Sequence, residues 1–351
     1  MVLLFKGANR ATGVTTDRLG TETYAAKSWI ELGRTTLSSA GDSINVASLS
    51  TADYPYLMVL THAIQSGVII PSYQFNGDTG NNYAIRHQIN GNSDGTSTST
   101  GKIQWQNAGT ADTNFGVGDI FNKSGQETLV IQSTVKSDTG ASNTPNREEL
   151  AAKWANTNSL TAVNVMNTQS GDFASGSEVV VLGAKSSGTD TSKGSFWQEL
   201  GSETISSDGD SFDLTFTAKK YLWVQLWNVD SATGDMVMRF NNDSANNYAE
   251  RYSDDGGSDS TNDTKGGIDS NYGALSGNTL ANYHIINKQD KEKLVIYDYA
   301  IANSAGAGNA PQRMEAVGKW ANTSAQINRI TVTCGGGNFD VGSTLKVWGF
   351  D

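Results

Sequence analysis

Cysteine, proline and histidine are scarce in this chain, which has 351 residues with one cysteine, four prolines and three histidines. The single cysteine, Cys334, cannot form an internal disulfide, so cross-links do not stabilise this fold. No apolar stretch approaches the roughly 20 residues of a membrane span. The apolar start, MVLLF, is too short for the core of a signal peptide. We therefore expect synthesis in a cytosol and no contact with a membrane.

Positive charge is in deficit, with 25 Lys and Arg against 36 Asp and Glu, a net charge of −11. A surface that binds phosphates needs a basic patch, so this balance argues against a nucleic-acid partner. The sequence also lacks GxSxG, HExxH, the phosphate-binding GxxxxGK[ST] and zinc-type Cys/His spacings. We predict a protein that is not an enzyme, with no catalytic residues, no metal ligands and no cofactor.

The chain is rich instead in glycine, with 38 residues, and in serine, threonine and asparagine. Short apolar segments with β-branched or aromatic residues alternate with these polar clusters, as in GVII at 67–70 and YLWVQLW from Tyr221, and each is expected to form a strand. Alternation with period two is the pattern of a strand with one buried face, and the polar clusters suit tight turns. The composition therefore predicts an all-β protein.

A dozen residues occur twice. FNGDTGNNYAIR spans Phe75–Arg86 and FNNDSANNYAER spans Phe240–Arg251, with eight identical positions and a shift of 165 residues. Further pairs lie at shifts of 165 to 168: SWIELG with FWQELG, YLMVL with YLWVQL, NKSGQETLVI with NKQDKEKLVI, NTPNR with NAPQR, and KWANT with KWANT. Two long repeats of domain size indicate tandem domains related by internal duplication, since a solenoid needs three or more short units.

The repeats predict a domain at residues 27–185 and a second at 196–351, joined by a Ser/Thr/Gly-rich connector at 186–195. Residues 1–26 form an N-terminal extension or arm. Each repeat lacks a βαβ rhythm, which favours an antiparallel β-sandwich, jelly-roll-like in architecture. Two segments favour a helical turn within this scheme: 146–156 (NREELAAKWAN) and 313–322 (RMEAVGKWAN).

The repeated dozen supplies the candidate site. One interpretation is a rigid turn, in which Asn and Asp side chains bind nearby backbone amides and each Arg pairs with the Asp of its own loop. The other is a ligand loop for a sugar or for Ca²⁺, with amide, carboxylate and aromatic groups as contacts. Each loop has one acidic residue, which is few for calcium. The candidate ligand or contact residues are Asn76, Asp78, Asn82, Tyr83 and Arg86 in the first copy, and Asn241, Asp243, Asn247, Tyr248 and Arg251 in the second.

Three other features have simpler expectations. The acidic run SDDGGSDSTND at 253–263 is expected to be a solvated loop. NTPNR and NAPQR each place an arginine two residues after a proline, where a turn can bring it to a neighbouring carboxylate. The paired tryptophans are expected in cores or in subunit contacts: Trp29, Trp154, Trp197 and Trp320.

The motifs together resemble a domain of tailed-phage virion structural proteins. The resemblance rests on FNGDTGNNY, on the later KWANT segment and on a Gly-Asn/Asp-Phe-x-x-Gly-Ser turn before a final strand that closes on glycine. That strand ends Val181-Leu182-Gly183 in the first repeat and Val347-Trp348-Gly349 in the second, where the family commonly has Leu-Tyr-Gly. The resemblance covers both repeats, essentially residues 27–351.

The resemblance implies a non-enzymatic component of a phage virion, in capsid decoration, tail or fibre, assembled in the host cytoplasm. The partners it implies are other virion proteins and further copies of this chain in a homo-oligomer. A carbohydrate-binding adhesin that recognises a host surface glycan is the first alternative, and a polysaccharide-degrading enzyme is the second.

Overall fold

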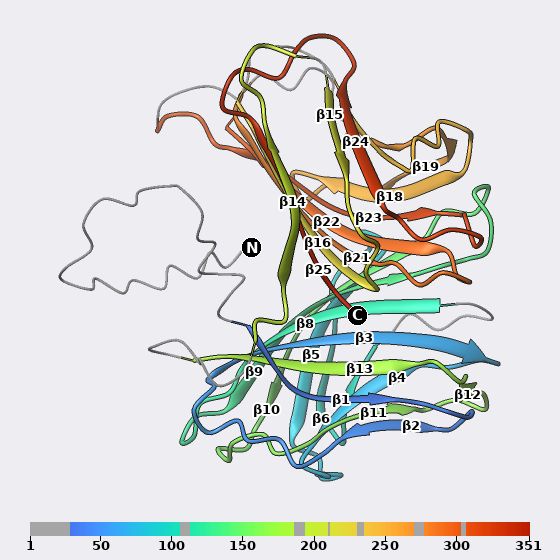
Figure 1. The fold of residues 1–351 in the computed structure, drawn as a ribbon. Helices are drawn as coiled ribbons and strands as arrows, with labels where there is room; N and C mark the ends of the chain where they lie inside the picture. The colour runs from blue at the N-terminus through green and yellow to red at the C-terminus, as the bar shows by residue number, and fades with distance from the viewer. Residues whose placement is uncertain are drawn as a thin grey trace.

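The computed structural model describes residues 29–105, 113–185, 194–209, 211–229, 235–269, 277–302 and 307–351. All regular structure in these ranges is β-strand, and most pairings are long and antiparallel. Figure 1 shows two bodies of sheet, one blue to green and the other yellow to red. The all-β prediction is confirmed. Residues 1–26 and most of the predicted connector lie outside the described ranges.

The first body, called the first domain below, holds a nine-stranded sheet in the order β1-β13-β3-β8-β9-β10-β5-β6, with β12 on β3, and a four-stranded sheet in the order β2-β11-β4-β7, counted over the described residues. Its strands are β1 (Ile30–Thr36), β2 (Ser43–Val46), β3 (Tyr56–Ser66), β4 (Pro71–Phe75), β5 (Tyr83–Ile89), β6 (Gly95–Thr100), β7 (Ile103–Gln104), β8 (Thr113–Phe121), β9 (Thr128–Lys136), β10 (Asn146–Trp154), β11 (Val163–Asn167), β12 (Asp172–Phe173) and β13 (Glu178–Ala184).

The second domain repeats this plan, with an eight-stranded sheet in the order β14-β25-β16-β21-β22-β23-β18-β19 and a four-stranded sheet in the order β15-β24-β17-β20 among the described strands. Its strands are β14 (Gln198–Thr204), β15 (Ser211–Thr215), β16 (Tyr221–Asn228), β17 (Met236–Phe240), β18 (Tyr248–Asp254), β19 (Ser260–Lys265), β20 (Ile268–Asp269), β21 (Thr279–Ile286), β22 (Lys293–Ile301), β23 (Gln312–Trp320), β24 (Arg329–Cys334) and β25 (Thr344–Phe350).

The orders of the two large sheets correspond position by position, with β1 equivalent to β14 at one edge and β6 equivalent to β19 at the other. Even an irregularity is shared, because the pairing register shifts between Glu31 and Gly33 and again between Glu199 and Gly201. The repeated letters ELG thus mark a β-bulge at the same edge of each large sheet. The descent of both halves from one ancestral domain stays a prediction.

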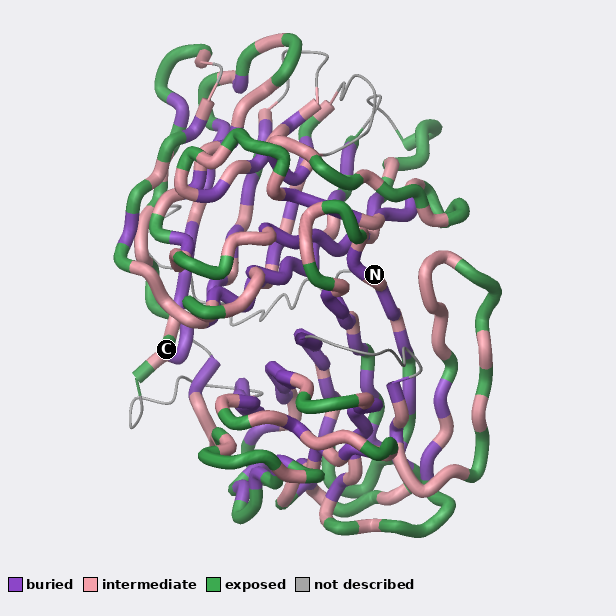
Figure 2. Tube along the Cα trace, turned by 90° about the vertical axis from the view of Figure 1, so that its right-hand side faces the viewer, coloured by how far each residue is buried: buried purple, intermediate pink, exposed green. Residues whose placement is uncertain are grey.

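A separate apolar core fills each sandwich between its large and small sheets. Strands of the small sheets bury one face only, so β11 and β17 alternate buried and half-buried residues. Strand β13 is buried at every position, because both faces of its sheet are covered. Exposed residues gather in loops and at sheet edges, as Figure 2 shows in green.

Two expectations about local structure are wrong. The segments expected to hold helical turns are the strands β10 and β23, each paired on both sides. Their helix-forming residues yield to the period-two burial of Leu150, Ala152 and Trp154, which face the core. A strand expected at 67–70 is instead the connection between β3 and β4, where Gly67 has a φ of 122°.

The second core contains a buried carboxylate. Glu250 accepts hydrogen bonds from Asn262 Nδ2 at 2.8 Å, from the Asp269 amide at 3.0 Å and from the Tyr297 hydroxyl at 2.9 Å. Burial nevertheless raises the pKa of Glu250 to about 7. The corresponding position of the first domain is Ile85, which is also buried.

We predict that Glu250 makes the stability of the second domain dependent on pH. Its folded pKa lies above the unfolded value, so its contribution is complete below about pH 4.3 and is lost as the pH rises through about 7. Relative to Glu250→Gln, which cannot ionise, the wild-type free energy of unfolding should fall by roughly 2–3 kcal/mol between pH 5 and pH 8. Urea unfolding of both proteins across this range measures the difference, and parallel pH profiles would contradict it.

Candidate functional site

The first copy of the repeated dozen forms the turn between β4 and β5, and Asp78 is at its centre. One carboxylate oxygen accepts the Gly80 amide at 2.8 Å. The other accepts Asn82 Nδ2 at 2.9 Å and the indole N–H of Trp154 at 2.7 Å. The bonds from Trp154 and Asn82 hold the pKa of Asp78 below its usual value. The carboxylate therefore fastens the turn to β10 of the large sheet.

Tyr83 closes the same turn from the inside. Its hydroxyl accepts the Phe75 amide at 3.0 Å and donates to the Asp78 carbonyl at 3.1 Å. The ring is buried and stacks on Trp154 with an interplanar angle of 16°. Burial raises the pKa of Tyr83 to about 12. This ring is part of the core and is not open to a ligand.

Asn76 ties the turn to the chain that precedes β11. Its φ of 52° is in the left-handed region, which Asn tolerates better than most residues. Its Nδ2 donates to the Ser159 carbonyl at 3.0 Å, and its Oδ1 accepts the amides of Thr161 and Ala162 at 2.7 and 3.1 Å. The side chain thus substitutes for backbone pairing between two loops.

The second copy repeats this geometry bond for bond. Asp243 accepts the Ala245 amide at 2.9 Å, Asn247 Nδ2 at 2.8 Å and the Trp320 indole at 2.7 Å. Tyr248 is buried and bridges Phe240 and Asp243 as Tyr83 bridges their counterparts. Asn241 binds the Gln326 carbonyl and the amides of Asn328 and Arg329.

The expectation that each arginine of the motif pairs with the aspartate of its own loop is wrong, and the two arginines differ from each other. Arg86 forms an exposed ion pair with Asp94 at 3.2 Å. Arg251 donates from Nε to the Pro145 carbonyl of the first domain at 2.9 Å. The loop interpretation missed this because the partner belongs to the other domain, 106 residues away in sequence.

The outer faces of the two large sheets meet in a third apolar cluster. The first domain contributes Leu60 and Phe115, and the second contributes Tyr221 and Leu294, among others. Trp29 and Trp197 also lie in this cluster, whereas Trp154 and Trp320 are in the two sandwich cores. The expectation of core or contact tryptophans is confirmed, with the contact lying between domains of one chain.

The loop between β9 and β10 of the first domain extends over the second domain. Its backbone makes most of the contacts: Lys319 Nζ donates to the Asp138 carbonyl, and the Thr264 amide donates to the Ala141 carbonyl at 3.0 Å. Glu292 accepts the Gly140 amide at 2.7 Å and the Ser137 hydroxyl. These bonds depend on the path of the loop more than on its side chains.

Arg147, the arginine of NTPNR, reaches the carboxylate of Asp259 in the second domain at 2.6 and 3.3 Å. Both side chains are almost fully buried, at 2% and 1% exposed. The expected arginine–carboxylate contact is therefore made, and it takes its aspartate from the acidic run that was expected to be solvated. Most neighbours of Asp259 in that run are exposed, as expected.

A second buried carboxylate, Glu178 of β13, lies at the other side of the contact. It accepts Lys220 Nζ and the Tyr221 hydroxyl, both at 2.8 Å, and lies 3.4 Å from Arg34. Burial raises its pKa, but the bond from Lys220 and the charge of Arg34 bring the pKa below its usual value overall. The carboxylate is thus ionised and held by both domains.

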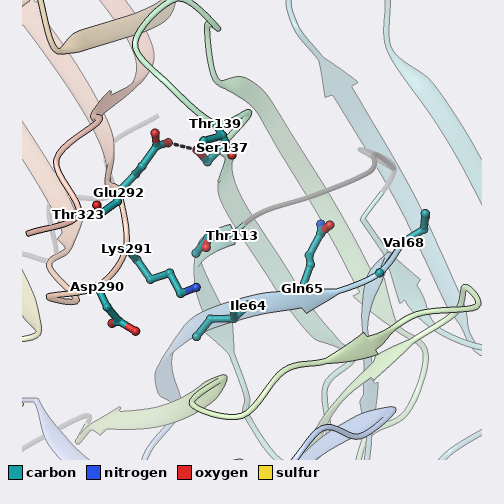
Figure 3. Close-up of a pocket in the computed structure, with 11 residues that line it drawn as sticks. Ile64, Gln65, Val68, Thr113, Ser137, Thr139, Asp290, Lys291, Glu292 and Thr323 are labelled. Carbon is teal, nitrogen blue, oxygen red and sulfur yellow. Dashed lines mark hydrogen bonds between the residues drawn. The ribbon is translucent and has the colours of Figure 1, made fainter.

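A cleft of about 460 Å³ opens along the seam between the domains. Gln65 and Thr113 line one wall, and Lys291 and Glu292 line the other. In Figure 3 Glu292 points at Ser137 across the seam, while Lys291 extends toward Thr113 and Ile64. The carboxylate of Glu292 in this cleft is already bound to the first domain, so the cleft marks the edge of the domain contact.

Within the described ranges, no group of three or more His, Cys, Asp or Glu is placed to hold a metal ion. Over the same ranges, no helix is long and apolar enough to cross a membrane. The candidate residues of both repeated turns are bound to their own domain, apart from Arg251.

We predict that Asp78→Ala destabilises the first domain by about 1–3 kcal/mol, because it leaves the indole N–H of Trp154 without its acceptor. Asp53→Ala, at an exposed aspartate outside the turn, should change the free energy of unfolding by less than about 0.5 kcal/mol. Denaturant unfolding of the two variants tests this, and equal effects would show that the turn bonds contribute little.

We predict that Arg147→Ala lowers the free energy of unfolding by about 3–5 kcal/mol, because it leaves the buried Asp259 carboxylate unpaired. The matched control is Arg313→Ala, since Arg313 occupies the corresponding position of the second domain and is 55% exposed. That change should stay within about 0.5 kcal/mol. Calorimetry of dilute protein measures both, and a mild effect of Arg147→Ala would mean that the pair is not buried in solution.

Comparisons with known proteins give no family. No family model matches the chain, and no curated protein matches it. Among solved structures, a match to a cryo-EM structure of the arabinofuranosyltransferase AftD from Mycobacteria has 10% identity and a TM-score of 0.14. The match covers 94% of this chain and 33% of that one, so the chain spans about a third of its length. A TM-score this low carries no argument about fold or function.

Proposed function

We propose that this chain is a structural component of a bacteriophage virion and acts through protein–protein contacts without catalysis. The observation that carries the proposal is the use of the repeated motif. Asp78 and Asp243, with their Asn and Tyr neighbours, bind the turns of their own domains. The motif residue that reaches outside its domain, Arg251, binds another domain of the same kind.

The assignment to a phage particle comes from the resemblance of the motifs to tailed-phage virion proteins. A contact function fits the domain interface, where buried ion pairs surround an apolar cluster. A buried apolar centre with a polar rim is the usual anatomy of a protein–protein interface. On this proposal, other virion proteins and further copies of the chain are the partners, and the site of action is capsid decoration, tail or fibre.

The carbohydrate-binding alternative would use the repeated loops as recognition loops. Tyr83 and Tyr248 are at most 1% exposed, so neither ring can stack on a sugar in this conformation. A glycan-binding role would need other residues, and a glycan array with the intact protein distinguishes the two functions. Binding to one class of bacterial surface glycan would favour the adhesin.

The test of the proposed function is the location of the protein. Particles purified by density gradient from a lysate of cells that express the chain with its neighbouring genes should contain it in a fixed copy number per particle. Quantitative mass spectrometry gives this number, and antibody labelling in electron micrographs gives the position. A chain that stays in the particle-free fraction, at no constant ratio to the capsid protein, would contradict the proposal.

A further inference from the structure

A surface that the second domain buries against the first is exposed on the first domain itself. Leu294 and Ile296 of β22 are 0% and 4% exposed, because the first domain covers them. Their counterparts at the shift of 165 residues, Leu129 and Ile131 of β9, are 52% and 40% exposed. The residue types are the same in both domains, and only the cover differs.

The charged residues around Leu129 and Ile131 are also exposed, whereas their counterparts in the second domain are buried. Asp259 of the second domain has a side chain that is 1% exposed, and its counterpart Asp94 is 48% exposed. Lys319 is 0% exposed, and its counterpart Lys153 is 46% exposed. We call the exposed set on the first domain the docking face, which comprises Arg86, Asp94, Glu127, Leu129, Ile131 and Lys153.

All six residues of the docking face recur in the second domain, as Arg251, Asp259, Glu292, Leu294, Ile296 and Lys319. Neighbouring positions that do not face the contact have changed, such as Thr128, which is Lys293 in the second domain. The packing of the first sandwich does not require two large aliphatic side chains on a solvent-facing strand. A covering partner gives both of them a role.

The charged members of the docking face pair with each other while it is exposed. Arg86 binds Asp94 at 3.2 Å, and Lys153 binds Glu127 at 2.9 Å. In the second domain the equivalent residues turn to the first domain: Arg251 binds the Pro145 carbonyl, Asp259 binds Arg147, and Glu292 binds the Gly140 amide. Exposed ion pairs contribute little, so exchanging them for buried ones is feasible.

The structure also supplies a loop that can cover the docking face. The second domain is covered by the β9–β10 loop, which ends at Pro145 and is followed by Arg147 at the start of β10. The counterpart β22–β23 loop ends at Pro311, and Arg313 follows at the start of β23 with the same spacing. Residues 307–311 are exposed, and so is Arg313, whose guanidinium pairs with Glu315 and whose main chain is bonded to Asp255. The chain therefore has an exposed face on one domain and the matching loop on the other.

We propose that the docking face binds residues 307–313 of a second copy of this chain, with Arg313 of one copy at Asp94 of the next. This contact between copies deepens the proposed function, and it rests on that function only for the identity of the partner. The contact uses different surfaces on the two copies. A row of copies therefore has an unbound docking face at one end and an unbound β22–β23 connection at the other. Contacts of this kind build rings or filaments.

The contact between copies is smaller than the contact between domains. Beneath the β9–β10 loop the first domain presents Phe115, Val117 and Val135, whereas the second domain has Leu280, Asn282 and Ala300 at the same places. The part of the first domain near Tyr56 is already in the interdomain cluster. Less apolar area is therefore removed from water, and association should depend on protein concentration.

A charge exchange tests the proposal. Sedimentation velocity of the wild-type protein should show the average mass rising with concentration. Asp94→Arg should remain monomeric, because it opposes two arginines, and Arg313→Asp should remain monomeric, because it opposes two aspartates. An equimolar mixture of these two variants should associate again, since each contact in an alternating assembly then joins opposite charges. The expected loss in each single variant is at least tenfold in association constant.

Both variants change exposed residues, so circular dichroism and the melting temperature should stay at wild-type values. A wild-type protein that is monomeric at every concentration would overturn the proposal. Association that persists in both single variants, or that the mixture does not restore, would also overturn it. Because this test uses purified protein in solution, it is independent of whether the chain is found in virus particles.

Discussion

The large sheets of this protein carry apolar side chains on both faces, and this constraint organises the molecule. One face packs on the small sheet of its own sandwich, and the other needs a second cover. Leu60 and Val180 of the first domain meet Leu294 and Val317 of the second in the outer cluster. An isolated domain would expose this cluster to water, so tandem packing is a requirement of the sheets.

The polar groups at the domain contact determine how the two domains are oriented on the apolar cluster. The carboxylates of Glu178 and Asp259 are buried at opposite sides of the interface, and each is paired with a cation from the other domain. Removing such groups from water costs free energy that their partners must offset, so they add orientation more than affinity. They fix which part of each face is covered and which part, around Leu129, is left exposed.

The sequence was informative about most of what one domain alone decides. Identical letters at a constant spacing predicted two similar sandwiches, and the tryptophans were placed correctly. Local propensity failed at β10, where Ala and Glu favour a helix but pairing with β5 and β9 wins. Strand β8 was not predicted, because glycines interrupt its apolar pattern. Gly116 in this strand lies against the Trp105 ring, which leaves no room for a side chain.

The residues that join the domains were beyond prediction because an outward apolar residue on a strand looks the same as an inward one. In TLVIQ the alternation gives no sign that Leu129 and Ile131 face away from the core of their own domain. The role of Arg251 was hidden for the same reason, since its partner Pro145 is known only once the domains are placed. Comparing the exposure of equivalent residues in the two halves supplies the missing signal.

The main-chain bond from the Phe196 amide to the Trp29 carbonyl, 2.7 Å long, places the beginnings of the two domains side by side. The described contacts therefore hold the two domains together independently of the covalent connection between them. Cleavage of that connection would give a nicked but bipartite protein, held by the same surfaces. Fragments made separately are then candidates for complementation, and a gene split at this point is compatible with the same architecture.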